Sequence, residues 1–208
     1  MEIEYIVQTP FYTQGFWSLV LHCETDETKT HAPSRISGII HADKNVNLDG
    51  IFKEVRTLKT KYGRHPLLLP LQLFITHFSM TVEKVNSIVN DVASVEKNLL
   101  EELSPDYKHK NAGERYKKLS KTLHQCSMDL AELDRRKMFE QDLGKLIEEQ
   151  LGNDINPANG ENTEDEKEGL HQEVSLFMGM AGSRNLDIAA LPGRIESLKN
   201  VVSSPCAF

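Results

Sequence analysis

The sequence predicts an α+β fold that is predominantly α. It should contain a small N-terminal sheet with a covering helix, then a long antiparallel coiled-coil-like helical hairpin and shorter C-terminal helices. Three observations predict this fold. The N-terminal part contains short runs rich in β-branched and aromatic residues, the middle repeats apolar residues every seven positions, and the C-terminal part carries apolar stripes at helical spacing.

Three short runs near the N-terminus are the expected strands: "EYIVQ" (4–8), "GFWSLVLHC" (15–23) and "SRISGIIH" (34–41). The polar stretch 24–33 ends in a proline and separates the second run from the third, as a hairpin loop does. Two or three strands cannot build a stable core alone, so a helix must cover one face of the sheet.

Residues 47–63 supply this covering helix. Gly63 follows the last apolar position and predicts the C-terminal stop. The apolar residues that fall at helical spacing are Leu48, Ile51, Phe52, Val55 and Leu58. Residues 1–64 are therefore expected to form a small α/β region.

The stretch "HPLLLPLQLFITHF" (65–78) is the most apolar part of the chain. Its apolar run from Leu67 to Ile75 is about half of the roughly 20 residues that a membrane-spanning helix needs. Pro70 and Gln72 also interrupt it. We therefore expect this stretch to be the buried start of a long helix over 66–103, at the place where that helix meets the sheet.

Apolar residues continue along this helix in two seams, a pattern typical of coiled coils. One seam contains Leu71, Phe78, Val85, Val92 and Leu99, and the other contains Phe74, Ile75, Val82, Ile88, Val89 and Val95. Turn-forming residues follow at 104–113. A second helix over about 112–151 has its own apolar seam, which shifts at 134–142 in the manner of a stutter. Two such helices joined by a short polar loop predict an antiparallel hairpin over 65–151.

The remainder of the chain divides into a linker and a helical tail. Residues 152–169 are acidic and lack apolar periodicity, so we expect a flexible linker there. Two shorter helices are expected at 170–180 and 188–202, within a C-terminal helical segment 170–208. Pro192 and Gly193 lie inside the second stripe, so that helix is expected to begin near them.

Composition excludes some classes of protein. The formal net charge of −7 and the lack of a basic stripe argue against nucleic-acid binding. Cys23, Cys126 and Cys206 are far apart and form no CxxC pair, which favours a reducing compartment and a cytoplasmic location. The N-terminus lacks the pattern of a signal peptide. With no apolar window of spanning length, we expect a soluble chain.

The search for chemistry yields few candidates. His22, Cys23, His31 and His41 lie in the strand region, where a hairpin could bring some of them to a metal ion, although no HExxH or paired-cysteine spacing supports a site. Surface histidines are the simpler interpretation. The sequence also lacks a phosphate-binding glycine loop and a nucleophile elbow, so we expect no catalytic residues and no enzyme activity.

Clusters of charge have a simple interpretation as solvated helix faces. We assign this role to Glu101, Glu102, Glu148 and Glu149. The run "DRRK" (134–137) offers a local anion patch, but neighbouring acidic residues neutralise it. We therefore expect this run to be a charged, solvent-facing surface.

The order of these segments resembles the cytosolic region of fungal CorA-like magnesium transporter proteins. The likeness rests on "GFWSLVLHCETDETKTHAPSRISGIIH" (15–41), on "HPLLLPLQLFITHF" (65–78) leading into a heptad helix that ends "VEKNL" (95–99), and on "LDIAALPGRIESLKNVV" (186–202). In that family a similar phrase opens a long helix after an α/β domain. The likeness covers most of residues 15–151 and 170–202.

The resemblance does not extend to the pore of that family. There the last long helix continues into a membrane span, a Gly-Met-Asn signature and a second span. Here "SSPCAF" (203–208) stands where the first span is expected, and "GMAG" (179–182) lacks the asparagine. No pore residue is carried over, and we expect the chain alone not to transport.

Two functions follow as expectations. The resemblance implies a cytosolic region of a CorA-like Mg²⁺ transporter that forms homo-oligomers or associates with a membrane-embedded relative, with Mg²⁺ as a regulatory ion. The alternative is a free-standing helical interaction protein, which binds partner helices through the heptad seam.

Overall fold

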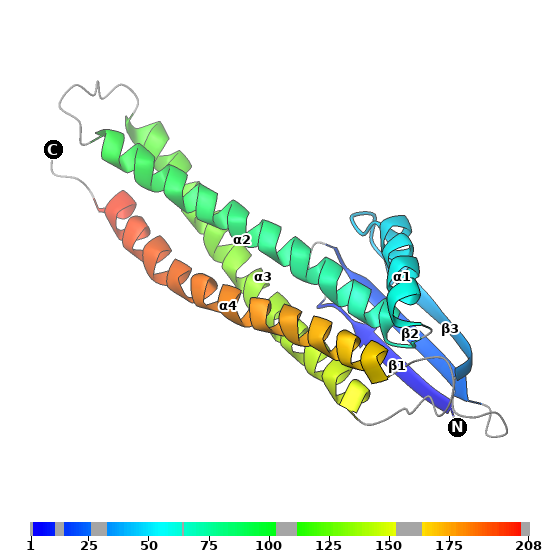
Figure 1. Cartoon of the computed structure of the whole chain (residues 1–208). Coiled ribbons are helices and arrows are strands. Elements are labelled where there is room, and N and C mark those ends of the chain that lie inside the picture. Colours follow the sequence, from blue (N-terminus) through cyan, green and yellow to red (C-terminus); the bar gives the residue numbers. More distant parts are fainter. Residues whose placement is uncertain are drawn as a thin grey trace. The chain divides into compact units, whose positions relative to one another are not determined.

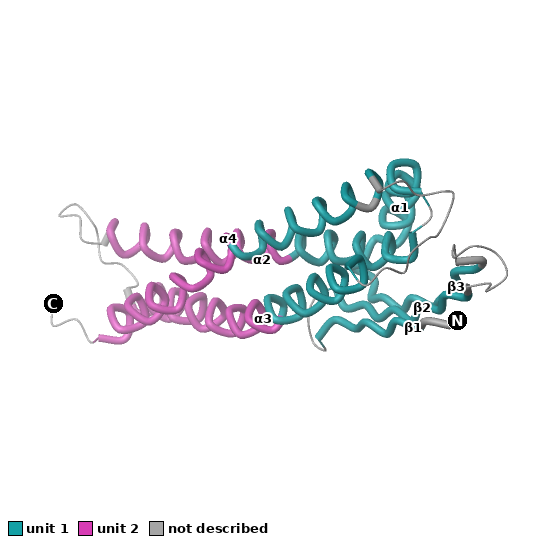
Figure 2. Tube along the Cα trace, turned by 60° about the horizontal axis from the view of Figure 1, so that its bottom comes forward, with its two compact units in different colours: residues 1–80, 136–182 teal, residues 81–135, 183–208 magenta. Residues whose placement is uncertain are grey.

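The computed structural model describes residues 2–10, 15–25, 33–63, 65–102, 112–152 and 164–204. These residues form three strands followed by four helices (Figure 1). The chain divides into two compact units (Figure 2). Unit 1 comprises residues 1–80 and 136–182, and unit 2 comprises residues 81–135 and 183–208.

Unit 1 contains an antiparallel sheet with the strand order β1-β2-β3, which includes the predicted hairpin of the second and third strands. Its strands are β1 (Glu2–Gln8), β2 (Trp17–Thr25) and β3 (Pro33–Ala42). Side chains alternate between the two faces, because successive residues of a strand point in opposite directions. One face is apolar and buried, and its β2 residues are Trp17, Leu19, Leu21 and Cys23.

Helix α1 (Leu48–Tyr62) confirms the predicted covering helix. The Asn47 side chain caps its N-terminus by accepting a hydrogen bond of 3.0 Å from the Gly50 N–H. Gly63 ends it with φ of +66°, a left-handed conformation that costs glycine little. The buried positions Ile51, Leu58 and Tyr62 face the core of unit 1.

Helix α2 (Leu68–Glu102) begins within the apolar stretch 65–78, and its start is fixed by His65. The His65 ring Nδ1 accepts from the Leu67 N–H at 3.2 Å, and the His65 carbonyl accepts from the Leu68 N–H at 3.3 Å. Pro70 lies in the first turn, where its missing N–H breaks no helical bond.

The apolar stretch is buried in protein, as predicted. Its residues pack with those of the sheet, of α1 and of the adjacent parts of α3 and α4. The members of this stretch with almost no exposed surface are Leu67, Leu68, Leu71, Leu73 and Phe74. Within the part of the chain that the structure describes, no helix has the length and apolar character needed to cross a membrane.

Helix α3 (Ala112–Gly152) runs antiparallel to α2 within each unit, which confirms the predicted hairpin. In unit 1, His77 of α2 contacts Glu140 of α3. In unit 2, Lys84 pairs with Asp129, and Asn98, further along α2, contacts Arg115, which comes earlier in α3.

Unit 2 is a bundle of three helical segments, from α2, α3 and α4, around one apolar core. Its buried members are Val85, Ile88, Val92 and Val95 of α2, Leu119, Leu123, Cys126 and Leu133 of α3, and Ile188, Leu191 and Ile195 of α4. The heptad seam that we expected to receive partner helices is therefore covered by helices of the same chain.

Helix α4 (Glu164–Ser203) corrects two predictions. Residues 164–169 of the expected linker are helical, and residues 153–163 lie outside the described part. The two expected C-terminal helices are one continuous helix with Pro192 inside it. Leu191 and Ile195 are buried on either side of Pro192, so packing of the apolar stripe overrides the proline penalty of about 3 kcal/mol.

The compact units also differ from the four regions predicted from the sequence. The first expected boundary lay between residues 64 and 65. The observed division instead cuts each long helix, at residues 80, 135 and 182. Each long helix contributes one part to the core of the sheet-containing unit and another to the core of the bundle.

We predict that Val85→Asp strongly destabilises the protein. Val85 is buried in the core of unit 2, so the substitution buries a carboxylate without a partner, at a cost of several kcal/mol. Asn86→Asp is the matched control, because the neighbouring Asn86 is exposed. Thermal denaturation should show a large decrease in Tm for the first variant and almost none for the second. Equal shifts would contradict the assigned helix face.

Candidate functional site

The structure does not bring the candidate metal ligands of the strand region together. His22 pairs in register with Ser37, whereas His41 pairs with Ser18, four residues away along β2. Cys23 lies on the buried face, where burial raises the pKa of its thiol. His31 lies outside the described residues. No group of three or more His, Cys, Asp or Glu side chains suited to a metal ion occurs in the described ranges.

His22 has acidic neighbours on its own sheet face. Its ring nitrogens lie 3.5 Å from Glu4 on β1 and 3.5 Å from Glu24 on β2. Both carboxylates are well exposed, so water screens these contacts and they contribute little to stability. The arrangement is that of a surface histidine.

The prediction that the charged helix residues face solvent is correct for some of them. Glu101 and Glu149 are exposed, and Glu148 is half-buried and accepts a hydrogen bond from Ser175 at 3.3 Å. The side chain of Glu102 lies outside the described residues. The prediction for "DRRK" is wrong at Arg136, whose side chain is only 2 % exposed. Asp134 and Arg135 are exposed.

The most deeply buried polar contact in unit 1 joins α2 to α3. His77 Nδ1 lies 2.9 Å from Glu140 Oε1, and both side chains are 0 % exposed. The Phe139 ring stands edge-on to the His77 ring at 4.9 Å and to the Trp17 ring at 5.6 Å. The pair therefore lies beside an aromatic contact that connects the sheet to both helices.

Sequence reasoning missed this pair because it searched the apolar seam for apolar residues only. In unit 1 the buried positions of α3 include Arg136, Glu140, Leu143 and Ile147, at helical spacing. What we interpreted as a shift of the seam is a place where charged residues occupy buried positions. One feature of the sequence could have predicted the pair: positions 136 and 140 continue the helical spacing of the buried residues of α3, and α2 contains a histidine at position 77.

Tyr62 and Lys61 connect the end of α1 to α4. The Tyr62 hydroxyl donates a hydrogen bond to Glu173, and the Lys61 Nζ lies 3.5 Å from the same carboxylate and 4.5 Å from the centre of the Tyr62 ring. Burial, followed by the bond to Glu173, raises the pKa of Tyr62. The phenol therefore stays protonated and remains a donor to the carboxylate.

Asp43 organises the turn that precedes β2. Its carboxylate accepts hydrogen bonds from the backbone N–H groups of Gly15 at 3.0 Å, Phe16 at 3.1 Å and Asn45 at 2.6 Å. Burial alone would raise the pKa of Asp43, but these donors outweigh it and lower the pKa. Gly15 has φ of +79°, which explains the glycine there.

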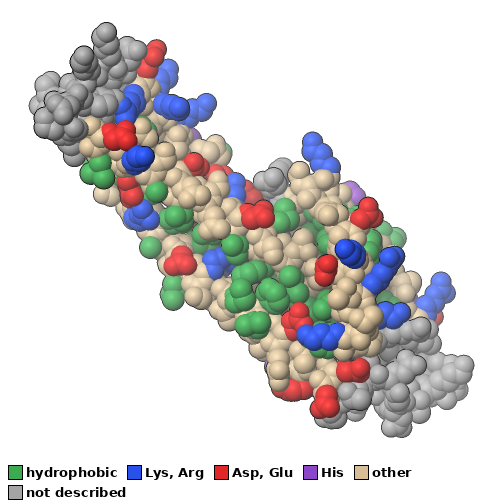
Figure 3. All heavy atoms as spheres, turned by 45° about the horizontal axis from the view of Figure 1, so that its top comes forward, with side chains coloured by type: hydrophobic (Ala, Val, Ile, Leu, Met, Phe, Trp, Pro, Cys, Tyr) green, Lys and Arg blue, Asp and Glu red, His purple; other side chains and the backbone are tan. Residues whose placement is uncertain are grey.

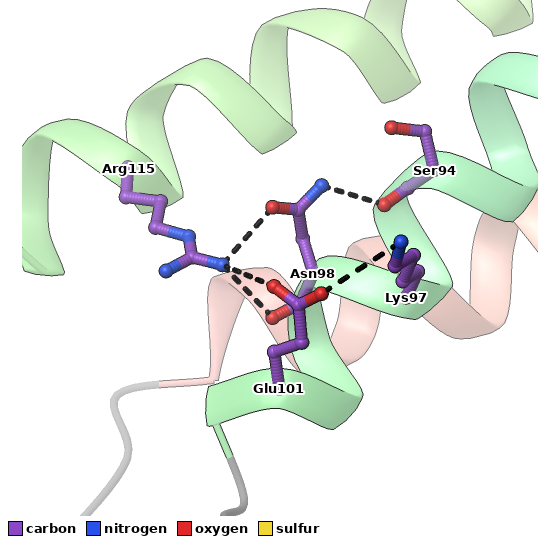
Figure 4. Close-up of polar contacts among 5 residues, drawn as sticks. All are labelled: Ser94, Lys97, Asn98, Glu101 and Arg115. Carbon is purple, nitrogen blue, oxygen red and sulfur yellow. Dashed lines mark hydrogen bonds and ion pairs between the residues drawn. The ribbon is translucent and has the colours of Figure 1, made fainter. Parts of the chain in front are cut away.

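In unit 2 the end of α2 is held to the start of α3 by Arg115 (Figure 4). The Arg115 guanidinium donates to the carbonyl of Asn98 at 3.2 Å and to its side-chain oxygen at 3.0 Å. Its Nη2 also lies 3.7 Å from Glu101. These contacts connect the last turns of α2 to the first turns of α3.

Two further ion pairs stabilise the same bundle. Lys84 lies 2.8 Å from Asp129 and 3.5 Å from Glu132; burial lowers the pKa of Lys84, but these carboxylates outweigh burial and raise it. Arg194 of α4 binds both oxygens of Glu96 at 2.8–3.2 Å. These charges connect helices to one another.

The second face of the sheet has a different character. Ile6, Val20 and Ile39 lie in register on three neighbouring strands and are 74, 42 and 75 % exposed. They form an aliphatic row on the face opposite the helices. Elsewhere, acidic and basic side chains are interspersed on the face that Figure 3 shows, without a basic stripe. The aliphatic row is thus a candidate for contact with protein.

Comparisons with protein-family models, with curated proteins and with solved structures find no match to this chain.

We predict that Glu140→Ala lowers the free energy of unfolding by about 3–5 kcal/mol, the usual cost of removing one partner of a buried pair. His77 would then remain buried without the carboxylate. Glu149→Ala on the exposed side of α3 is the matched control and should be nearly neutral. Denaturant titration of both variants measures the difference. Similar midpoints would show that the pair contributes nothing to stability.

We predict that Asp43→Asn destabilises unit 1 by about 1 kcal/mol near neutral pH, as expected for partly exposed hydrogen bonds to a charged acceptor. The pKa of Asp43 is lower in the folded protein than the usual aspartate value of about 3.9. Its contribution is therefore complete above that value and is lost as pH falls through the folded pKa.

Unfolding curves at several pH values test this dependence. The difference between Asp43→Asn and the wild type should shrink below about pH 3.9. Asp142→Asn serves as the control, because Asp142 is an exposed residue of α3. A difference that persists unchanged at low pH would mean that the Asp43 charge is not responsible.

Proposed function

We propose that the chain is a non-enzymatic assembly module of the kind that forms the cytosolic region of CorA-like magnesium transporters. It would assemble with other subunits and would not carry cations itself. The observation that carries the proposal is the position of residues 65–78. This stretch completes the core of the sheet-containing unit and also begins the long helix α2.

The arrangement of the other elements supports the same proposal. An antiparallel sheet and α1 come first, followed by the three long helices. This is the order that the family resemblance implies, including a last long helix that contains the stretch 186–202. Within unit 1, Phe177 of α4 contacts Phe74 and Phe78 of α2 with ring centres 6.5 and 5.7 Å apart.

The charged groups support a structural role for the helices. Glu96, Asp129 and Glu173 each bind a cationic side chain of another helix. The proposal therefore gives the helices the role of a rigid support, while contacts with other subunits are made by their remaining surface. Mg²⁺ enters it as a regulatory ion bound between neighbouring subunits, as the resemblance implies.

The second candidate function is a free-standing interaction protein. One observation favours it: the aliphatic row Ile6–Val20–Ile39 is exposed on a sheet face, where a protein surface could cover it. The heptad seam does not serve this function, because helices of the same chain already occupy it.

Co-expression distinguishes the two functions. We predict that residues 1–208 alone do not restore growth in low magnesium to cells that lack their own magnesium uptake system. When a full-length CorA-like subunit from the same source is co-expressed, the chain should co-purify with it from detergent-solubilised membranes. Restored growth with the chain alone would contradict the proposal. Failure to co-purify, with the chain folded, would favour the free-standing interaction protein.

A further inference from the structure

The outer edge of β3 is an unusual feature of unit 1. β3 lies at one side of the sheet and pairs with β2, and no other described strand pairs with it. The pairing is regular from Trp17↔Ala42 to Glu24↔Arg35, and the register shift lies beyond it, at Glu24/Thr25. The strand therefore presents a row of backbone donors and acceptors over residues 35–42 that no bulge interrupts.

This edge lacks the usual protection against pairing with another strand. Natural edge strands carry charges, prolines or bulges that block such pairing. The segment 36–42 ("ISGIIHA") contains no Lys, Arg, Asp, Glu or Pro, and the side chains from Arg35 to Ile39 are exposed. Its three isoleucines have high strand propensity. The edge is thus suited to accept a strand.

We propose that a second copy of this chain pairs with this edge, so that two β3 strands run antiparallel about a two-fold axis at Ile39. The two three-stranded sheets then form one sheet of six strands. This inference does not depend on the transporter-like role proposed above, because it rests on the sheet alone.

The register follows from the side chains. Paired residues of two antiparallel strands point to the same face of the sheet, and side chains alternate between the faces along each strand. The aliphatic rows of the two copies therefore share one face only if odd-numbered residues pair with odd-numbered residues. With Ile39 opposite Ile39 of the second copy, the exposed row becomes continuous across six strands. Pairing about Gly38 would instead place each Ile39 opposite a serine.

The charges are compatible with the same register. With Ile39 on the axis, Arg35 of one copy lies opposite Asp43 of the other, and Ser37 lies opposite His41. Arg35 is exposed, and Asp43 follows directly after β3, where its carboxylate accepts three backbone hydrogen bonds. Opposite charges on facing strand positions are favourable.

Two substitutions with matched exposure test the proposal. Ile39→Lys places like charges opposite each other on the axis, whereas Ile6→Lys places a lysine in the same row, on the far strand. The parent residues are 75 and 74 % exposed. Sedimentation equilibrium of the full chain should show a dimer for the wild type and for Ile6→Lys. Ile39→Lys should weaken the dimer at least about tenfold.

Each alternative gives a different result. If the sheets packed face to face through the aliphatic row, both lysine variants would weaken the dimer. If the edge of β1 were used, only Ile6→Lys would weaken it. A wild type that is monomeric at all accessible concentrations would leave the β3 edge to a strand of another protein. Any of these results would overturn the proposal.

A cysteine scan tests the register directly. Ile39→Cys, in a Cys206→Ser background, should form an intermolecular disulfide under mild oxidation, because facing Cα atoms of antiparallel strands lie about 4.5–5.5 Å apart. Ser37→Cys should not, since the two introduced thiols would lie about 13 Å apart along the strands. The reverse pattern would exclude the Ile39 axis.

Discussion

The fold depends on the need to keep one face of a small sheet away from water. Three strands do not bury that face by themselves. In unit 1 it shares one core with α1 and with parts of α2, α3 and α4, and Leu71, Leu73 and Phe74 of α2 have no exposed surface there. His65 fixes the register at which this helix begins. The first turns of α2 are therefore also part of the core that the sheet needs.

The buried pair of His77 and Glu140 makes a second contribution near this core. Burying two polar side chains carries a desolvation cost, which a hydrogen bond between them offsets. The 2.9 Å contact between His77 Nδ1 and Glu140 Oε1 has hydrogen-bond length. Since apolar residues would fill the same space without a desolvation penalty, we infer that the pair specifies which positions of α2 and α3 face each other.

Much of this organisation was predictable from residue spacing. The strands, α1 and the hairpin of α2 and α3 follow from periodicity and from turn residues such as Gly63. These signals are local, so they depend little on the rest of the fold. The burial of the apolar stretch 65–78 was also predictable, because its length excluded a membrane span.

The predictions that were wrong concern features that depend on contacts between distant segments. Pro192 breaks a helix by local rules, yet Leu191 and Ile195 are buried beside it, and packing decides the outcome. Arg136 belongs to a charged run, yet its position on α3 falls between buried residues. In each case the sequence shows the residue but not the surface against which it packs. The same limit hid the pair of His77 and Glu140, which lie 63 positions apart.

The way in which the chain uses its apolar surface bears on how it can bind a partner. In the sequence, the heptad seam of α2 is the surface that most resembles a binding motif. In the structure, its residues from Val85 onward pack in the core of unit 2. The sheet, in contrast, keeps an exposed aliphatic row and one unprotected edge. Helix packing needs complementary side chains, whereas strand pairing uses the backbone N–H and C=O groups that alternate residues present at the edge. A strand edge is therefore the simpler route to assembly for this chain.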